Sequence, residues 1–163
     1  MNDVPPDPAP TYLQLRSRIL SLDPVDAGLT PSLTAAHIWG VLMETSYNVG
    51  TATLVALADG TTSLYYSTGG GLLGSGEYAP LAKASKALVT EAENHLQQMS
   101  ITHQFPLPKV GQVRFIFLTY SGAFTTDATE RKLASMKHPL SRLYRLGQET
   151  LAQLRILTEK ETK

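Results

Sequence analysis

The chain has 163 residues and no cysteine, and its fourteen basic and fourteen acidic residues give a formal net charge of zero. The lack of cysteine excludes disulfides, thiolate zinc sites and cysteine nucleophiles, and the balanced charge argues against nucleic acid as a partner, because its binders usually carry a positive excess. No run of 18 apolar residues predicts a membrane span, and the N-terminus lacks the basic-then-apolar order of a signal peptide, so we expect no membrane partner and a cytoplasmic location.

Residues 1–9 form a proline-rich arm with three prolines. Proline has no backbone N–H and restricts the residue before it, so neither a helix nor a central strand is predicted there. Residues 10–163 are predicted to form a single domain, which is the usual organisation for a chain of this length.

The first helix is predicted over residues 10–22. Its apolar residues recur at spacings of three and four, as on one face of a helix: Tyr12, Leu15, Ile19 and Leu22. The polar residues, Arg16 among them, fall largely off this face.

Three strands are predicted next, over residues 37–47, 51–58 and 61–67. The dipeptide Asp59-Gly60 between the last two is a strong hairpin signal, so the strands are expected to form an antiparallel meander. The first two strands are apolar on both faces. Either helices cover both sides of the sheet or a second subunit covers one side.

The rest of the chain predicts two strands and two helices. A long amphipathic helix is expected over residues 77–99, strands over 113–120 and 123–130, and a last helix over 139–159. Gly147 falls in the buried stripe of the last helix and indicates close backbone approach, to the sheet or to a second subunit. The predicted fold is therefore α+β, with an antiparallel sheet of four or five strands and both long helices packed on it.

A glycine-rich turn separates the third strand from the long helix. Its candidate binding residues are Gly69, Gly70, Gly71, Gly74, Ser75 and Gly76. Three of these glycines have the G-x-G-x-x-G spacing that lets phosphate approach the backbone at a helix N-terminus. The preceding meander argues against a dinucleotide-binding βαβ unit. Two interpretations stay open: a connector, with Ser75 or Gly76 as the helix N-cap, and an anion site.

No other pattern predicts catalysis, a metal or a cofactor. The four histidines are scattered without ligand spacing. Aromatic residues that could line a cleft, or simply pack in the core, are Trp39, Tyr65, Tyr66, Tyr78, Tyr120 and Tyr144. A locally basic stretch around the start of the last helix indicates a solvated face or a docking site for an acidic partner; it comprises Arg131, Lys132, Lys137, Arg142 and Arg145.

Four runs, WGVLMET, TLVALADGTTSLYYSTGGG, GSGE and HPLSRLY, resemble a family of small uncharacterised bacterial proteins, over nearly all of residues 38–157. This resemblance implies no catalytic residues. More loosely, the predicted order of helix, meander, long helix, hairpin and helix is similar to the roadblock and profilin-like folds. Those are scaffolding or small-GTPase-regulating modules that often dimerise, so the similarity implies a homodimer.

Two functional hypotheses follow. The first is a non-enzymatic interaction or regulatory module that self-associates, with a protein partner; it is favoured by the two-faced sheet and by Gly147. The alternative is a small-ligand, nucleotide or anion-binding protein, enzymatic or not, that uses the turn at residues 69–76.

Overall fold

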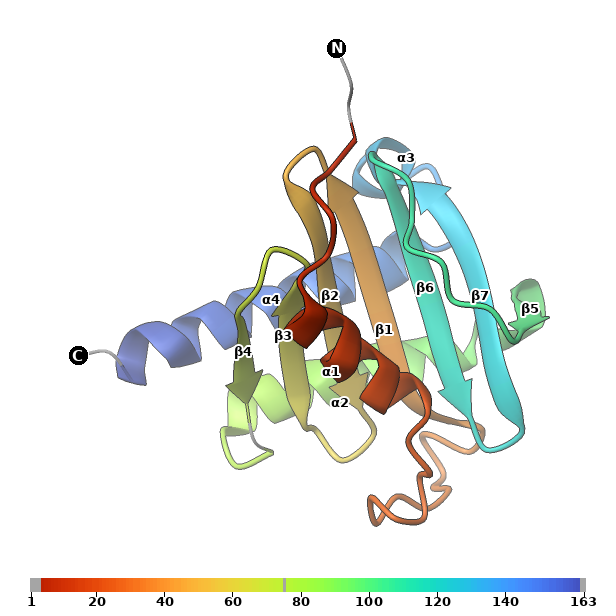
Figure 1. Ribbon diagram of the computed structural model, residues 1–163. Coiled ribbons are helices and arrows are strands. Elements are labelled where there is room, and N and C mark those ends of the chain that lie inside the picture. The colour runs from red at the N-terminus through yellow and green to blue at the C-terminus, as the bar shows by residue number, and fades with distance from the viewer. Residues whose placement is uncertain (1–3, 75, 162–163) are drawn as a thin grey trace.

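The computed structural model describes residues 4–74 and 76–161, which form an α+β fold on one seven-stranded antiparallel sheet (Figure 1). Across the sheet the strands follow the order β4-β3-β2-β1-β6-β7-β5. Their bounds are β1 (Ile38–Tyr47), β2 (Gly50–Leu57), β3 (Thr62–Tyr66), β4 (Gly71–Gly74), β5 (Ser100–Thr102), β6 (Gln112–Thr119) and β7 (Gly122–Thr129).

The α+β class and the antiparallel sheet are confirmed, but the predicted four or five strands are too few. The two further strands, β4 and β5, are the edges of the sheet. β4 lies within the stretch predicted as a glycine-rich turn, and β5 lies between the long helix predicted over residues 77–99 and the strand predicted over residues 113–120. Strands of four and three residues are too short to show an alternating pattern, so only their pairing with a neighbour reveals them.

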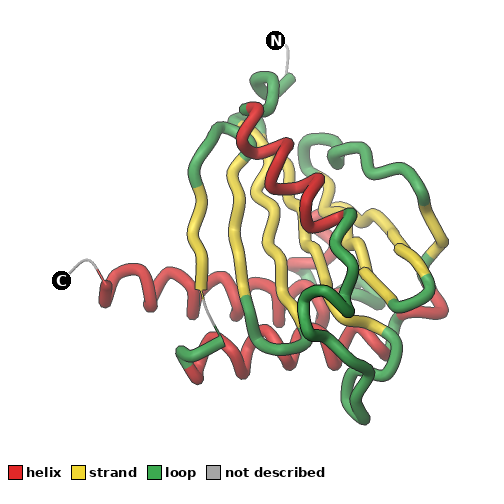
Figure 2. Tube along the Cα trace, turned by 60° about the horizontal axis from the view of Figure 1, so that its bottom comes forward, coloured by secondary structure: helices red, strands yellow, loops and turns green. Residues whose placement is uncertain are grey.

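Two helices lie side by side over one face of the sheet, which we call the rear face (Figure 1, Figure 2). They are α2 (Ala79–Glu93) and α4 (Ser141–Glu161). The rear core contains Val41, Met43, Leu54, Leu64, Phe115 and Phe117 from the strands and Leu81, Leu88, Leu143 and Leu154 from the helices. Burial of these side chains is the main force that holds the two layers together.

The start of α2 differs from the prediction. The helix begins at Ala79 with Tyr78 as its N-cap, and Pro80 lies in the first turn, where proline is tolerated. After Glu93 the helix gives way to the short 3₁₀ turn η1 (Leu96–Gln98). The predicted N-cap at residue 75 or 76 is wrong, because β4 and a short turn come before the helix.

The opposite face of the sheet, the front face, is covered by α1 (Pro10–Leu20) and by the loop over residues 21–37 (Figure 1). A second apolar cluster forms there; its buried residues are Ile19, Leu29, Trp39, Leu42, Val55, Leu57, Ile116 and Leu118. The chain itself therefore covers both faces of the sheet, which decides between the two arrangements that the sequence left open.

Polar contacts hold α1 against the front face. The Arg16 guanidinium donates through Nε and Nη2 to both oxygens of Glu44, at 2.6 and 2.8 Å. Thr53 donates to the same carboxylate at 2.8 Å, and its hydroxyl also bonds the Tyr12 hydroxyl at 2.7 Å. The placement of Arg16 off the buried face is wrong, since only 7% of this residue is exposed.

The remaining helix, α3 (Glu130–Ala134), occupies a stretch expected to end a strand and begin a loop. The proline-rich arm ends on the sheet, where the Ala9 N–H donates to the Ser67 carbonyl at 2.7 Å. Among the helices of the described residues, none combines the length and apolarity that a membrane crossing needs.

Candidate functional site

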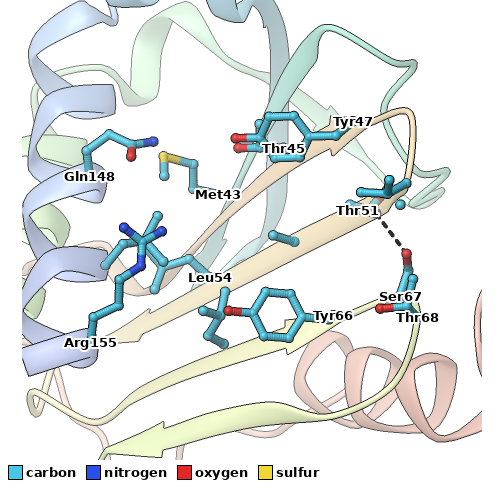
Figure 3. A pocket seen from close by; sticks show the side chains of 15 residues that line it. Met43, Thr45, Tyr47, Thr51, Leu54, Tyr66, Ser67, Thr68, Gln148 and Arg155 are labelled. Carbon is cyan, nitrogen blue, oxygen red and sulfur yellow. Dashed lines mark hydrogen bonds between the residues drawn. The ribbon is translucent and has the colours of Figure 1, made fainter. Parts of the chain in front are cut away.

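A hollow of about 220 Å³ opens on the rear face, at the end of the sheet where the β1–β2 and β3–β4 hairpins turn. The first three strands provide its floor, and α4 provides one wall (Figure 3). The hollow exists because α4 packs across the middle of these strands, and their ends extend past it.

The deep part of the floor is one row of neighbouring apolar residues. Met43 pairs with Leu54 across β1 and β2, and Leu54 pairs with Leu64 across β2 and β3. All three side chains are buried and belong to the rear core. The hollow therefore opens directly above the hydrophobic core, and a ligand there removes apolar surface from water.

Small residues on the middle strand create the depression. The next row toward the hairpins pairs Thr45 with Ala52 and Ala52 with Tyr66. In the last row Tyr47 pairs with Gly50. Because β2 offers only a methyl group and a hydrogen between strands that carry tyrosines, space remains between the two rings, which flank the hollow (Figure 3).

The wall contributed by α4 consists of Gln148, Leu151 and Arg155, which follow one another at helical spacing on one face. Gly147, next to them, lies against the sheet: a Cβ there would be 2.5 Å from the Met43 Sδ. This contact answers the question that the sequence left open at Gly147, since the close approach is to β1 of the same chain.

The lining of the hollow is polar at its rim and carries one charge. Among its fifteen residues there is no aspartate or glutamate, and Arg155 is the only lysine or arginine. No ion pair or hydrogen bond joins the Arg155 side chain to another described residue. Figure 3 shows Arg155 and Gln148 on one side of the hollow, across from Tyr47 and Tyr66.

The carboxylate of Glu130 lies behind Tyr47 and holds this side of the hollow through hydrogen bonds. The Tyr47 hydroxyl donates to Glu130 Oε2 at 3.2 Å, and the Tyr144 hydroxyl donates to the same oxygen at 2.8 Å. Burial and the Glu130 charge raise the pKa of Tyr47, and Arg155 opposes this shift. Burial and Glu130 also raise the pKa of Tyr144. Both phenols are therefore neutral hydrogen-bond donors near neutral pH.

The glycines predicted as a binding turn are spread along the edge of the sheet. Gly69 and Gly70 form the β3–β4 hairpin turn, both with positive φ, and Gly71 and Gly74 are the first and last residues of β4. Gly76 lies at the far end of that strand, near the Asp59 carbonyl. Ser75 lies outside the described residues. Gly69 and Gly70 therefore lie at the opposite end of β4 from the long helix, whereas Gly74 lies against Leu81 in the first turn of that helix. Binding at these glycines stays a prediction.

The hollow begins just before those glycines, at Ser67 and Thr68. Ser67 bonds the Thr51 N–H through its hydroxyl at 2.7 Å and so ties the end of β3 to the start of β2 (Figure 3). Of the aromatic residues that the sequence proposed for a cleft, Tyr66 lines the hollow. The sequence reasoning missed Tyr47, Ala52 and Arg155, although small residues in the second strand opposite tyrosines were a usable signal.

Three of the other candidate groups have structural partners. His37 lies 2.9 Å from Glu93, and His95 lies 2.8 Å from Glu91. In the basic stretch, Arg142 pairs with Glu91 at 3.0 Å. Within residues 4–74 and 76–161, no three or more histidine, aspartate or glutamate side chains are grouped to hold a metal ion.

Comparisons with protein-family models, with curated proteins and with solved structures find no match to this chain. The resemblances to small bacterial proteins and to the roadblock and profilin-like folds therefore stay predictions from the sequence. The proposals below depend on the geometry of the hollow alone.

Proposed function

We propose that the protein is a non-enzymatic binding module for a small organic molecule, which occupies the hollow between the β1–β3 strands and α4. The observation that carries this proposal is the apolar floor of Met43, Leu54 and Leu64 beneath a rim of hydroxyl, amide and guanidinium groups. An apolar pocket with a few converging polar groups is the usual form of a small-ligand site, in which the polar groups orient the ligand.

The volume of the hollow sets the size of the ligand. Drug-sized ligands occupy pockets of roughly 300–1,000 Å³, whereas a cavity of about 150 Å³ admits benzene. At about 220 Å³ the hollow fits one substituted ring or a short hydrocarbon chain. A nucleotide is too large to be enclosed, which separates this proposal from the nucleotide alternative raised by the sequence.

The test is a methyl NMR titration with benzyl alcohol as a neutral single-ring probe. We expect saturable shifts of the Met43 and Leu54 methyl groups, because both line the floor. Replacing Ala52→Phe fills the hollow and should abolish the shifts. Ala134→Phe adds the same ring at an exposed position on α3 and should leave them unchanged.

Two results would overturn the proposal. One is a titration to millimolar concentrations without saturable shifts in these methyl groups. The other is equal binding by the Ala52→Phe variant and the unchanged protein, with the variant shown to be folded by its thermal melt. Either would mean that the ligand does not enter the hollow.

The sequence also predicted a protein partner and a homo-oligomer. Both features that supported self-association are accounted for within one chain: α1 and the loop after it cover the front face, and Gly147 contacts Met43. Self-association stays a prediction from the sequence, without a described contact to support it.

A further inference from the structure

We propose that the ligand of the hollow is an organic carboxylate whose negative charge is bound by Arg155; this inference rests on the proposed binding function. Arg155 is the only charged residue among the described residues that line the hollow, and it lies beside the apolar floor. Arg155 lies on the same side of the hollow as Gln148, across from Tyr47 and Tyr66 (Figure 3).

No ion pair or hydrogen bond joins Arg155 to another described residue, in contrast to two other basic residues of the same helix. Arg142 pairs with Glu91, and Lys160 lies over the Tyr78 ring at 5.4 Å from its centroid. A guanidinium at the edge of an apolar hollow gains from an anion that replaces its water, because charge-assisted hydrogen bonds are the strong ones. A bound carboxylate supplies that anion.

Further donors around the hollow are also uncommitted. No hydrogen bond joins the Gln148 amide or the Tyr66 hydroxyl to another described residue. The Tyr47 hydroxyl is already engaged by Glu130, at 3.2 Å. Gln148 and Tyr66 are therefore available to donate to a ligand in the hollow, whose apolar body would lie on Leu54, Leu64 and Leu151.

The charges favour a singly charged carboxylate over a phosphate ester. Phosphate sites usually combine several cations or the N–H groups of a helix N-terminus. This hollow has one cation, and the wall from α4 comes from the interior of that helix. Glu130, behind Tyr47, adds a negative charge that disfavours a dianion.

The test compares benzoate with benzamide, which has the same shape without the charge, by NMR titration of the full chain. We expect benzoate to bind more tightly by up to about fivefold, because Arg155 is exposed and solvent weakens its pairing with an anion. Arg155→Gln should remove this preference, so that benzoate and benzamide then bind with similar affinity. Arg145→Gln, which removes a charge from an exposed position on the same helix, should preserve it.

The outcomes separate the inference from the proposed function. If both compounds bind equally and Arg155→Gln has no effect, the carboxylate assignment fails while the binding function stands. If neither compound binds, both fail. Tighter binding of phenyl phosphate than of benzoate would also overturn the assignment, in favour of a phosphate ester. Loss of the benzoate preference in 1 M salt would support it, because salt screens a partly exposed charge pair.

Discussion

At the scale of single residues, the most buried ion pair among the described residues is the one formed by Arg16 and Glu44. Glu44 is fully buried at the centre of β1, and its carboxylate accepts from both Arg16 and Thr53. Removing one partner of a buried ion pair leaves an uncompensated charge and costs roughly 3–5 kcal/mol, whereas replacing both partners with apolar residues costs much less.

We therefore expect Arg16→Met to lower the free energy of unfolding by about 3–5 kcal/mol. The double variant Arg16→Met, Glu44→Leu should lose less than this single variant, because it also removes the buried charge. Urea denaturation of the single and double variants measures the coupling. Arg18→Met, at an exposed position of the same helix, is the control and should stay within about 0.5 kcal/mol. A double variant that loses as much stability as Arg16→Met, or more, would contradict the expected coupling.

The pattern of the first helix could not reveal this contact. Tyr12 and Ile19 were predicted on the buried face and are buried, whereas Arg16 was assigned to the polar side. Arginine counts as polar in a helical pattern, because the pattern does not show that a carboxylate on the sheet pairs with it. Glu44 lies 28 positions further along the chain, so only the assembled fold brings the two together.

At the scale of elements, the packing of α4 on β1 depends on the absence of a side chain at Gly147. A Cβ there would lie 2.5 Å from the Sδ and 2.7 Å from the Cε of Met43. Alanine favours the helix by up to about 1 kcal/mol over glycine, but overpacking a filled core costs typically 1–3 kcal/mol. The contacted atoms are the end of a flexible side chain, but Met43 is buried and can move aside only by giving up its own contacts in the rear core, so we expect the second effect to be the larger one.

Gly147→Ala alone should therefore lower the free energy of unfolding. In a Met43→Ala background, where the thioether is gone, the same change should raise it by about 1 kcal/mol, since only the helix propensity remains. Guanidinium denaturation of the unchanged protein, the two single variants and the double variant measures the effect of Gly147→Ala in both backgrounds. A change of the same sign in both backgrounds would show that Gly147 has another role.

The link between α2 and α4 depends on pH through Glu91. This carboxylate bonds both His95 and Arg142, at 2.8 and 3.0 Å. Burial raises the pKa of Glu91, but the hydrogen bonds and charges of His95 and Arg142 outweigh burial and lower it below its usual 4.5. The stability that Glu91 adds is therefore fully present above pH 4.5 and is lost as the pH falls through the lowered pKa.

We expect Glu91→Gln to be less stable than the unchanged protein at pH 7, and the difference to shrink as the pH drops below 4.5. Urea midpoints measured from pH 7 to pH 3 follow this difference. Glu149→Gln, at an exposed position of α4, serves as the control. A difference that does not change with pH would mean that the charge of Glu91 contributes nothing to the helix pair.

The elements that the sequence predicted well are those with long, strongly patterned stretches. Strands β1, β2, β3, β6 and β7 lie within one or two residues of their predicted bounds, and the three long helices are all present. The missed elements are β4, β5 and α3, each of five residues or fewer. Glycine-rich composition reads as a turn, and only pairing with β3 makes residues 71–74 a strand.

At the scale of the whole molecule, the candidate site arises from neighbours that no linear pattern shows. Its floor needs the alignment of Met43 with Leu54 and Leu64, and its wall needs α4 to cross those strands. The sequence contained all of these residues, but the hollow is defined by the space that Ala52 and Gly50 leave between two tyrosines. The predicted site at the glycines was drawn from spacing alone, which carries no information about such a cavity.

The arrangement of the sheet also bears on whether the chain associates with itself. Both faces are covered by the chain's own segments, and the two edge strands have four and three residues. Short edge strands are a common way to prevent pairing between sheets, since they expose few unpaired backbone groups. These features favour a monomer over the homo-oligomer that the sequence predicted.

Light scattering after size-exclusion chromatography should accordingly give a mass near 17.7 kDa at every concentration loaded. Adding benzoate should not change this mass, because the hollow is formed within one chain. A mass of twice that value, stable on dilution, would restore the predicted dimer. Its interface would then use the sheet edges or the outer surfaces of the segments that cover the sheet, since both faces of the sheet are already covered.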